Sequence, residues 1–155
     1  MVQSSEVPCF ERFTATVGRT VDLGRAIGRL LVAGDVVSLN ADLGFGKTAL
    51  AGGIAAGMGL VDAAVTSPTF SLIHEYPTDP PLAHCDAYRL ADSDDFLALG
   101  VSELWEDGVV LVEWGDRVAD ALPPRTIRIT GTIDDDGVRR FAFANWPRVS
   151  ELPAD

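Results

Sequence analysis

The chain has 155 residues, 47% of them apolar, and it carries 12 Lys and Arg against 23 Asp and Glu, a formal net charge of −11. This length favours a single domain over residues 1–155, large enough to bury about 70% of its unfolded surface. The excess of negative charge disfavours direct binding to nucleic acid. No apolar run reaches the ~18 residues of a membrane span, and the acidic N-terminus does not fit a secretory signal, so we expect a cytoplasmic protein without membrane contacts. Cys9 and Cys85 lack the paired spacing of a zinc or redox site and are expected to be unpaired thiols.

The first half of the chain predicts two strand-helix units in succession. Residues 11–16 are typical of a strand, and Thr20 is expected to cap a helix. The apolar face of that helix comprises Val21, Leu23, Ala26, Ile27, Leu30 and Leu31. After a turn at Gly34-Asp35, residues 36–39 predict a buried β-branched strand, and residues 48–58, which are mostly Ala, Leu, Ile and Gly, predict a helix.

The second half predicts mainly strands. They are expected at residues 66–76, 82–88, 109–114, 125–130 and 139–146. Ser93, Asp94 and Asp95 are typical of a helix start, and this helix should end near Leu99. The turn at 134–137 joins the last two strands as an antiparallel hairpin. We therefore predict an α/β fold, a mixed parallel and antiparallel sheet with flanking helices.

The most informative segment is A-D-L-G-F-G-K-T, residues 41–48, which lies between a predicted strand and a predicted helix. A glycine-rich turn followed by a helix N-terminus surrounds an anion with backbone N–H donors, as in the phosphate-binding loop of P-loop NTPases. Ala41 stands where the strict pattern has Gly. The alternative is an ordinary strand-to-helix turn with a solvated Lys47.

The loop assigns roles to particular side chains. Lys47 would reach the β- and γ-phosphates of a nucleoside triphosphate, and the Thr48 hydroxyl would coordinate Mg²⁺. Trp114 either stacks on an adenine ring or belongs to the core. The predicted nucleotide-binding residues are Asp42, Leu43, Gly44, Phe45, Gly46, Lys47, Thr48, Ala49 and Trp114.

Two acids follow strands and are candidates for the other side of the metal. Glu113 ends the apolar run 109–112, and Asp86 lies in H-C-D-A-Y-R. In such sheets ligands sit beyond the carboxyl ends of strands, so we predict Glu113 and Asp86 as metal ligands and, with Lys47, as catalytic residues. The alternatives are a solvated acid at Glu113 and a salt bridge from Asp86 to Arg89. A lone histidine such as His84 is more often structural.

Thr66, Ser67, Pro68 and Thr69 form a further candidate element. Their hydroxyls are able to sense a γ-phosphate or its metal, as the switch loops of nucleotide hydrolases do. The alternative is a turn whose hydroxyls cap its own backbone.

Together, A-D-L-G-F-G-K-T, S-P-T-F with a downstream Tyr76, H-C-D-A-Y-R-L and L-V-E-W resemble the bacterial TsaE family over most of the chain. The resemblance implies a small Mg²⁺-dependent P-loop ATPase that assists synthesis of threonylcarbamoyladenosine at position 37 of tRNA. It also implies that Lys47, Thr48 and the loop glycines bind ATP, that Glu113 serves the magnesium site, that Asp86 is essential to turnover, and that residues 66–69 act as a switch.

The same resemblance implies partners. TsaD would perform the carbamoyl transfer in complex with TsaB, and this chain would hydrolyse ATP to reset that complex, meeting tRNA only indirectly. Weak activity alone and stimulation by the partners are expected. One rival is a nucleotide-regulated binding module whose hydrolysis is incidental. A second rival, a small-molecule or nucleotide kinase, would need an acceptor pocket and an arginine-bearing lid, which the sequence does not indicate.

Overall fold

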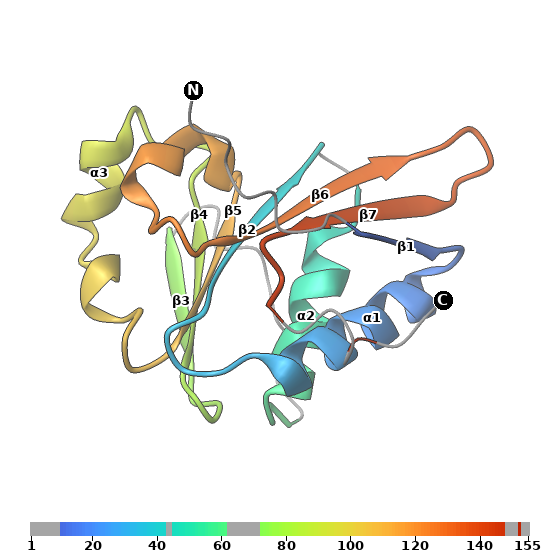
Figure 1. The fold of residues 1–155 in the computed structure, drawn as a ribbon, viewed down its shortest axis with the longest axis horizontal. Coiled ribbons are helices and arrows are strands. Elements are labelled where there is room, and N and C mark those ends of the chain that lie inside the picture. Colours follow the sequence, from blue (N-terminus) through green and yellow to red (C-terminus); the bar gives the residue numbers. More distant parts are fainter. Residues whose placement is uncertain (1–9, 43–44, 62–71, 148–151, 153–155) are drawn as a thin grey trace.

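The computed structural model describes residues 10–42, 45–61, 72–147 and 152 (Figure 1). One seven-stranded sheet runs through them in the order β1-β7-β6-β2-β5-β4-β3. Its strands are β1 (Phe10–Thr14), β2 (Val36–Ala41), β3 (Ile73–Tyr76), β4 (Leu82–Asp86), β5 (Val109–Glu113), β6 (Ile127–Ile133) and β7 (Arg139–Ala144). The central strands β6, β2, β5 and β4 are parallel, whereas β1, β7 and β3 pair antiparallel. The predicted α/β fold with a mixed sheet is confirmed.

Helices cover both faces of this sheet (Figure 1). The helices α1 (Val17–Leu30) and α2 (Lys47–Gly57) pack on one face, and α3 (Ser93–Ala98) with the 3₁₀ helices η1 (Val101–Glu103) and η2 (Gly115–Ala121) packs on the other. Successive residues of a strand point to opposite faces, so two separate cores form. No helix in the described residues is long and apolar enough to cross a membrane.

Glycines at the contact between α1 and α2 bring the two helix backbones close together. A Cβ at Gly28 would lie 2.1 Å from the Ile54 carbonyl oxygen, and one at Gly53 would lie 2.3 Å from the Val21 carbonyl oxygen. Both distances are below van der Waals contact, so only glycine fits without moving a helix. This packing fixes α2, whose first residue is Lys47.

Several predicted boundaries differ from the structure. The helix α1 begins at Val17 and not after Thr20, because the Thr16 hydroxyl accepts the Arg19 N–H at 3.1 Å as the N-cap. Thr20 is instead buried, with its hydroxyl 2.7 Å from that of Thr14.

Other differences concern the second half of the chain. Helix α3 begins at Ser93 and ends beside Leu99, as predicted, and its N-cap is Asp92, whose carboxylate accepts the Asp95 N–H. Strand β4 ends at Asp86 and not at Tyr88. Strand β3 confirms Ile73–Tyr76 of the predicted strand 66–76, and residues 66–71 lie outside the described part of the chain. The two 3₁₀ helices were not predicted, because one-turn elements carry little periodic signal.

Candidate functional site

The carboxyl ends of three parallel strands meet beside the start of α2. Strand β2 ends at Ala41, β4 at Asp86 and β5 at Glu113. Asp86 and Glu113 are direct register partners on neighbouring strands. The structure therefore brings the two predicted acids to one edge of the sheet, where α/β proteins place their ligands.

Lys47 lies among these strand ends. Its side chain is only 8% exposed, and Nζ donates to the carbonyl oxygens of Ala41 at 2.7 Å and Asp42 at 3.1 Å. Burial lowers the pKa of Lys47, and the negative charges of Glu113, Asp86 and Asp42 oppose that shift. The alternative of a solvated Lys47 is wrong for this structure.

The residue directly before α2 has a backbone conformation that favours glycine. Gly46 adopts φ +102°, in the left-handed region, and as the N-cap residue of α2 it has no side chain to accept from the first N–H groups of the helix. The N-terminus of a helix carries a partial positive charge that favours anions. Thr48 lies exposed in the first turn, and Ala49 follows it half-buried. Leu43 and Gly44 lie outside the described residues.

Ala41, the departure from the strict loop pattern, lies in the sheet. It is the last residue of β2, pairs with Gly131 of β6 and is buried. Extended backbone places no demand for glycine at this position. The departure from the strict loop pattern at Ala41 therefore lies in the strand, before the tight turn.

Glu113 is not a solvated acid. It is 2% exposed, and its Oε2 accepts a hydrogen bond at 2.8 Å from Nε2 of His84, which is fully buried. His84 Nδ1 has no hydrogen-bond partner among the described residues. Because an isolated buried carboxylate is costly, His84 stabilises Glu113 where it lies.

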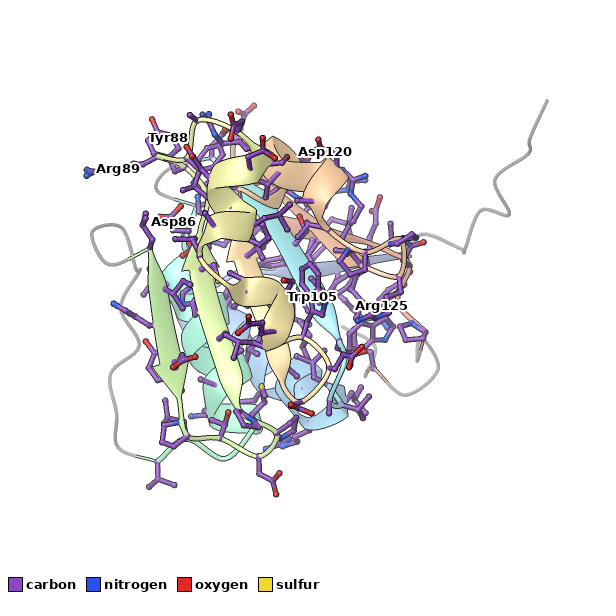
Figure 2. All side chains as sticks on the ribbon, turned by 90° about the vertical axis from the view of Figure 1, so that its left-hand side faces the viewer. Asp86, Tyr88, Arg89, Trp105, Asp120 and Arg125 are labelled. Atoms are coloured by element: carbon purple, nitrogen blue, oxygen red, sulfur yellow. The ribbon has the colours of Figure 1, made fainter. Side chains whose placement is uncertain are left out.

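Asp86 is 6% exposed, and its Oδ1 accepts the backbone N–H of Tyr88 at 2.9 Å. Figure 2 shows Asp86 at the end of its strand, with Tyr88 and Arg89 on the loop that follows and Arg89 extending outward. The Tyr88 contact is an Asx-type turn that orients the carboxylate.

Trp114 follows Glu113 directly. Its backbone is left-handed, with φ +59°, and the ring centroid lies 4.5 Å from Lys47 Nζ and 5.0 Å from the Tyr88 ring. A half-buried indole over an ammonium group is a cation–π contact. Trp114 also lines a cavity of about 340 Å³, together with Asn40, Ala41, Asp42, Asp116, Arg117, Thr130, Gly131 and Thr132.

The wall of this cavity contains contacts that sequence reasoning missed. Asn40 Oδ1 accepts the Asp116 N–H at 2.8 Å, Asn40 Nδ2 donates to Ser38 Oγ at 3.0 Å, and the Asp116 carboxylate pairs with Arg128. A polar Asn near the end of a mostly apolar strand was the available signal. The sequence around Asp116 and Arg128 gave no signal of their pairing, because the pairing depends on the position of η2 relative to β6 in the fold.

The donor set fits Mg²⁺ as this ion is usually bound. Within the described residues no group of three His, Cys, Asp or Glu side chains gathers to hold a metal. Mg²⁺ commonly needs only one or two carboxylates, the remaining ligands being phosphate oxygens and water. Asp86 and Glu113 supply two such carboxylates, and Thr48 lies exposed in the first turn of α2. The candidate switch residues Thr66, Ser67, Pro68 and Thr69 lie outside the described residues.

The strand-turn-helix unit and the buried lysine on a mixed sheet define an α/β protein of the P-loop NTPase-like class. The family model described as threonylcarbamoyl adenosine biosynthesis protein TsaE matches residues 14–141. The chain belongs to the TsaE family.

Curated relatives and a solved structure agree with this assignment. The chain is 41% identical to the tRNA threonylcarbamoyladenosine biosynthesis protein TsaE of Treponema pallidum over 126 residues, which are 81% of this chain and 93% of that protein. It is 40% identical to the protein of the same name from Mycobacterium tuberculosis over 148 residues, covering 87% of this chain and 88% of the relative. The crystal structure of Bacillus subtilis YdiB superposes with a TM-score of 0.80 at 30% identity, covering 96% of this chain and 94% of that one.

Proposed function

We propose that this chain binds and hydrolyses ATP in the biosynthesis of tRNA threonylcarbamoyladenosine, and that hydrolysis resets a complex of TsaB and TsaD between turnovers. The observation that carries the proposal is the buried Lys47 at the N-terminus of α2, beside the register pair Asp86 and Glu113. Membership of the TsaE family supports the pathway. One domain over residues 1–155 would hold the whole site.

Lys47 is the group that binds the phosphates. Its Nζ now donates to two neutral carbonyl oxygens. A triphosphate oxygen would be a stronger acceptor because it is charged, so Lys47 would exchange a carbonyl for it. The backbone N–H groups at the start of α2 would bind the same anion, because the N-cap residue Gly46 has no side chain to accept from them.

Thr48, Glu113 and Asp86 would hold Mg²⁺, directly or through water. The ion, when bound, supplies charge neutralisation between the β- and γ-phosphates. Glu113 suits a water-mediated role because Oε2 already accepts from His84. Thr48 suits direct coordination because it lies exposed in the first turn of α2.

Asp86 is our candidate for positioning the attacking water. Its Oδ1 is held by the Tyr88 N–H, so the carboxylate has a defined orientation at the sheet edge. It lies on the strand next to Glu113, on the side of the sheet that α2 covers. A carboxylate held beside phosphate-binding groups orients water for in-line attack on the γ-phosphorus.

The nucleoside would lie in the cavity beside Trp114. The indole offers a flat face for a purine, and the Thr130 and Thr132 hydroxyls with Asn40 offer polar contacts on the same cavity wall. Stacking of this kind tolerates different bases, so the cavity alone sets little preference among nucleotides.

Partner binding would complete the site. The chain carries a net charge of −11, which favours docking near a basic tRNA-binding surface and disfavours contact with the tRNA itself. We therefore expect slow ATP turnover by the chain alone and faster turnover with TsaB and TsaD.

The test is ATP hydrolysis by the purified chain, alone and with TsaB and TsaD, for the unaltered protein and for Lys47→Ala. Stimulation by the partners that disappears in Lys47→Ala is the expected result. Asp120→Ala, at an exposed acid on η2 bonded to Ser93, serves as a control that should keep full activity. Equal, partner-independent rates in the unaltered protein and Lys47→Ala would overturn the proposal.

A further inference from the structure

Arg139, the first residue of β7, contacts the loop before α2. Its Nε donates to the Phe45 carbonyl oxygen at 2.5 Å, across 94 residues of sequence. Its Cζ lies 5.9 Å from the centroid of the Phe45 ring. A Cβ at Gly46 would lie 3.3 Å from the same Nε, so the guanidinium packs directly against the turn.

The Phe45 side chain is also held in place, by residues of β6 and β7. It is 2% exposed and makes an edge-to-face contact with Phe141 of β7 at 5.2 Å between ring centroids. Gly131 of β6 leaves space for the ring, because a Cβ there would lie 2.4 Å from a Phe45 ring atom. The hairpin of β6 and β7 therefore contacts both the side chain and the backbone of Phe45. Figure 1 shows this hairpin extending past the start of α2.

Peptide geometry links these contacts to anion binding. In a planar trans peptide the C=O and the following N–H point in opposite directions. When Arg139 holds the Phe45 carbonyl, the Gly46 N–H is directed away from Arg139. Gly46 is also the left-handed residue at which the chain turns into α2. The direction of one loop donor is thus set by a side chain from β7.

We propose that Arg139 is a positioning residue for the phosphate loop, and that the β6–β7 hairpin, through Arg139, Phe141 and Gly131, holds Phe45 so that the N–H groups of Gly46 and of the first turn of α2 are preorganised for a triphosphate. The inference rests on the proposed ATP binding at this loop. Preorganised donors bind an anion without an ordering cost at the moment of binding. Loss of the Arg139 anchor should therefore weaken ATP binding while leaving the fold intact.

The experiment measures the dissociation constant of a fluorescent ATP analogue with Mg²⁺, and the melting temperature, for a set of variants of the full chain. Arg139→Ala should weaken binding about ten- to a hundredfold, the usual effect of losing a charge-assisted hydrogen bond. Arg139→Lys keeps a charged donor and should recover part of the affinity. Arg140→Ala is the matched control, because the adjacent arginine is exposed and pairs with Glu11. It should change binding less than about twofold.

A second variant separates positioning from charge. Phe45→Leu removes no charge and keeps apolar bulk, yet it loses the ring contacts with the hairpin. It should also weaken binding, with the melting temperature still showing a folded protein. Equal, small effects of Arg139→Ala and Arg140→Ala would overturn the inference, because they would reflect net charge only. Failure of the unaltered chain to bind the analogue would instead overturn the proposed function, and the inference with it.

Discussion

His84 and Glu113, 29 residues apart in sequence, form a buried hydrogen bond of 2.8 Å between Nε2 and Oε2, with side chains 1% and 2% exposed. Neighbouring parallel strands β4 and β5 bring them together. Because Glu113 is almost fully buried, its carboxylate depends on partners supplied by the protein.

Removing the histidine should therefore destabilise the protein. His84→Leu leaves the Glu113 carboxylate without this donor and should lower the free energy of unfolding by about 3 kcal/mol, measured by urea denaturation. His84→Gln keeps an N–H donor and should lose less. His74→Leu, at the register partner of His84 on strand β3, is the control and should cost under about 1 kcal/mol. Equal losses for the two leucine variants would contradict this account of the pair.

The titration of Lys47 gives a second prediction. Burial lowers the pKa of Lys47 below the ordinary value of 10.5. Lys47 is the only lysine in the chain, so ¹³C-lysine labelling yields one side-chain NMR signal that reports its pKa directly. A bound triphosphate favours the charged amine, so the midpoint should rise when ATP and Mg²⁺ are added.

The lowered pKa of Lys47 also determines how this residue makes the stability of the fold depend on pH. The unfolded chain keeps the Lys47 proton to a higher pH than the folded chain does. The cost of burying the charged amine is therefore present below the lowered pKa of Lys47 and is relieved as pH rises through it. ATP affinity should fall over that same alkaline range. A free-protein midpoint at or above 10.5 would contradict both statements.

The parts of the fold that were predictable are those with local signals. Strand β2, the Gly46 turn and α2 follow from a β-branched run, a glycine and an Ala-rich segment that are adjacent in sequence. The common edge of Asp86 and Glu113 followed from the rule that ligands sit beyond strand carboxyl ends. The start of α1 was misplaced because Thr16 and Thr20 are equally suitable caps one turn apart.

The parts that were not predictable depend on contacts between distant segments. The pairing of His84 with Glu113 requires the register of β4 on β5, and the contact of Arg139 with Phe45 requires the path of the last hairpin. Neither Arg139 nor Arg128 has a sequence neighbour that marks it. These residues form the outer support of the candidate site, whereas its central residues lie in short motifs.

Helix packing gives a prediction about glycine. Gly53→Ala should lower the free energy of unfolding by about 1–3 kcal/mol, because the new Cβ would lie 2.3 Å from the Val21 carbonyl oxygen. Gly18→Ala is the control: it also lies in a helix, but its Cβ would meet only Thr16 Oγ1, at 3.9 Å. That variant should raise stability by up to about 1 kcal/mol through helix propensity. Stabilisation by Gly53→Ala would contradict the close approach of α1 and α2.

Cys85 should be chemically inert in the folded protein. Burial raises the pKa of the Cys85 thiol to about 12, with Glu75 and Asp86 contributing in the same direction. At pH 8 almost no reactive thiolate is present, so iodoacetamide should leave Cys85 unmodified in native protein and modify it in urea, as peptide mass mapping can follow. Equal modification rates in the two conditions would contradict the buried position of strand β4.

The role of Asp86 decides between an ATPase and a nucleotide-regulated binding module. Asp86→Asn keeps the shape of the side chain and an oxygen able to accept from the Tyr88 N–H, but it removes the negative charge beside Lys47. ATP affinity should stay within a few fold of the unaltered protein, whereas single-turnover hydrolysis with TsaB and TsaD should fall about a hundredfold or more. Asp120→Asn, on η2 and labelled in Figure 2, is the control and should change neither quantity.

If Asp86→Asn hydrolyses ATP at the normal rate, Asp86 does not position the water. If it loses hydrolysis yet still supports repeated cycles of tRNA modification, ATP binding alone resets the partners, and the binding-module function is the correct one.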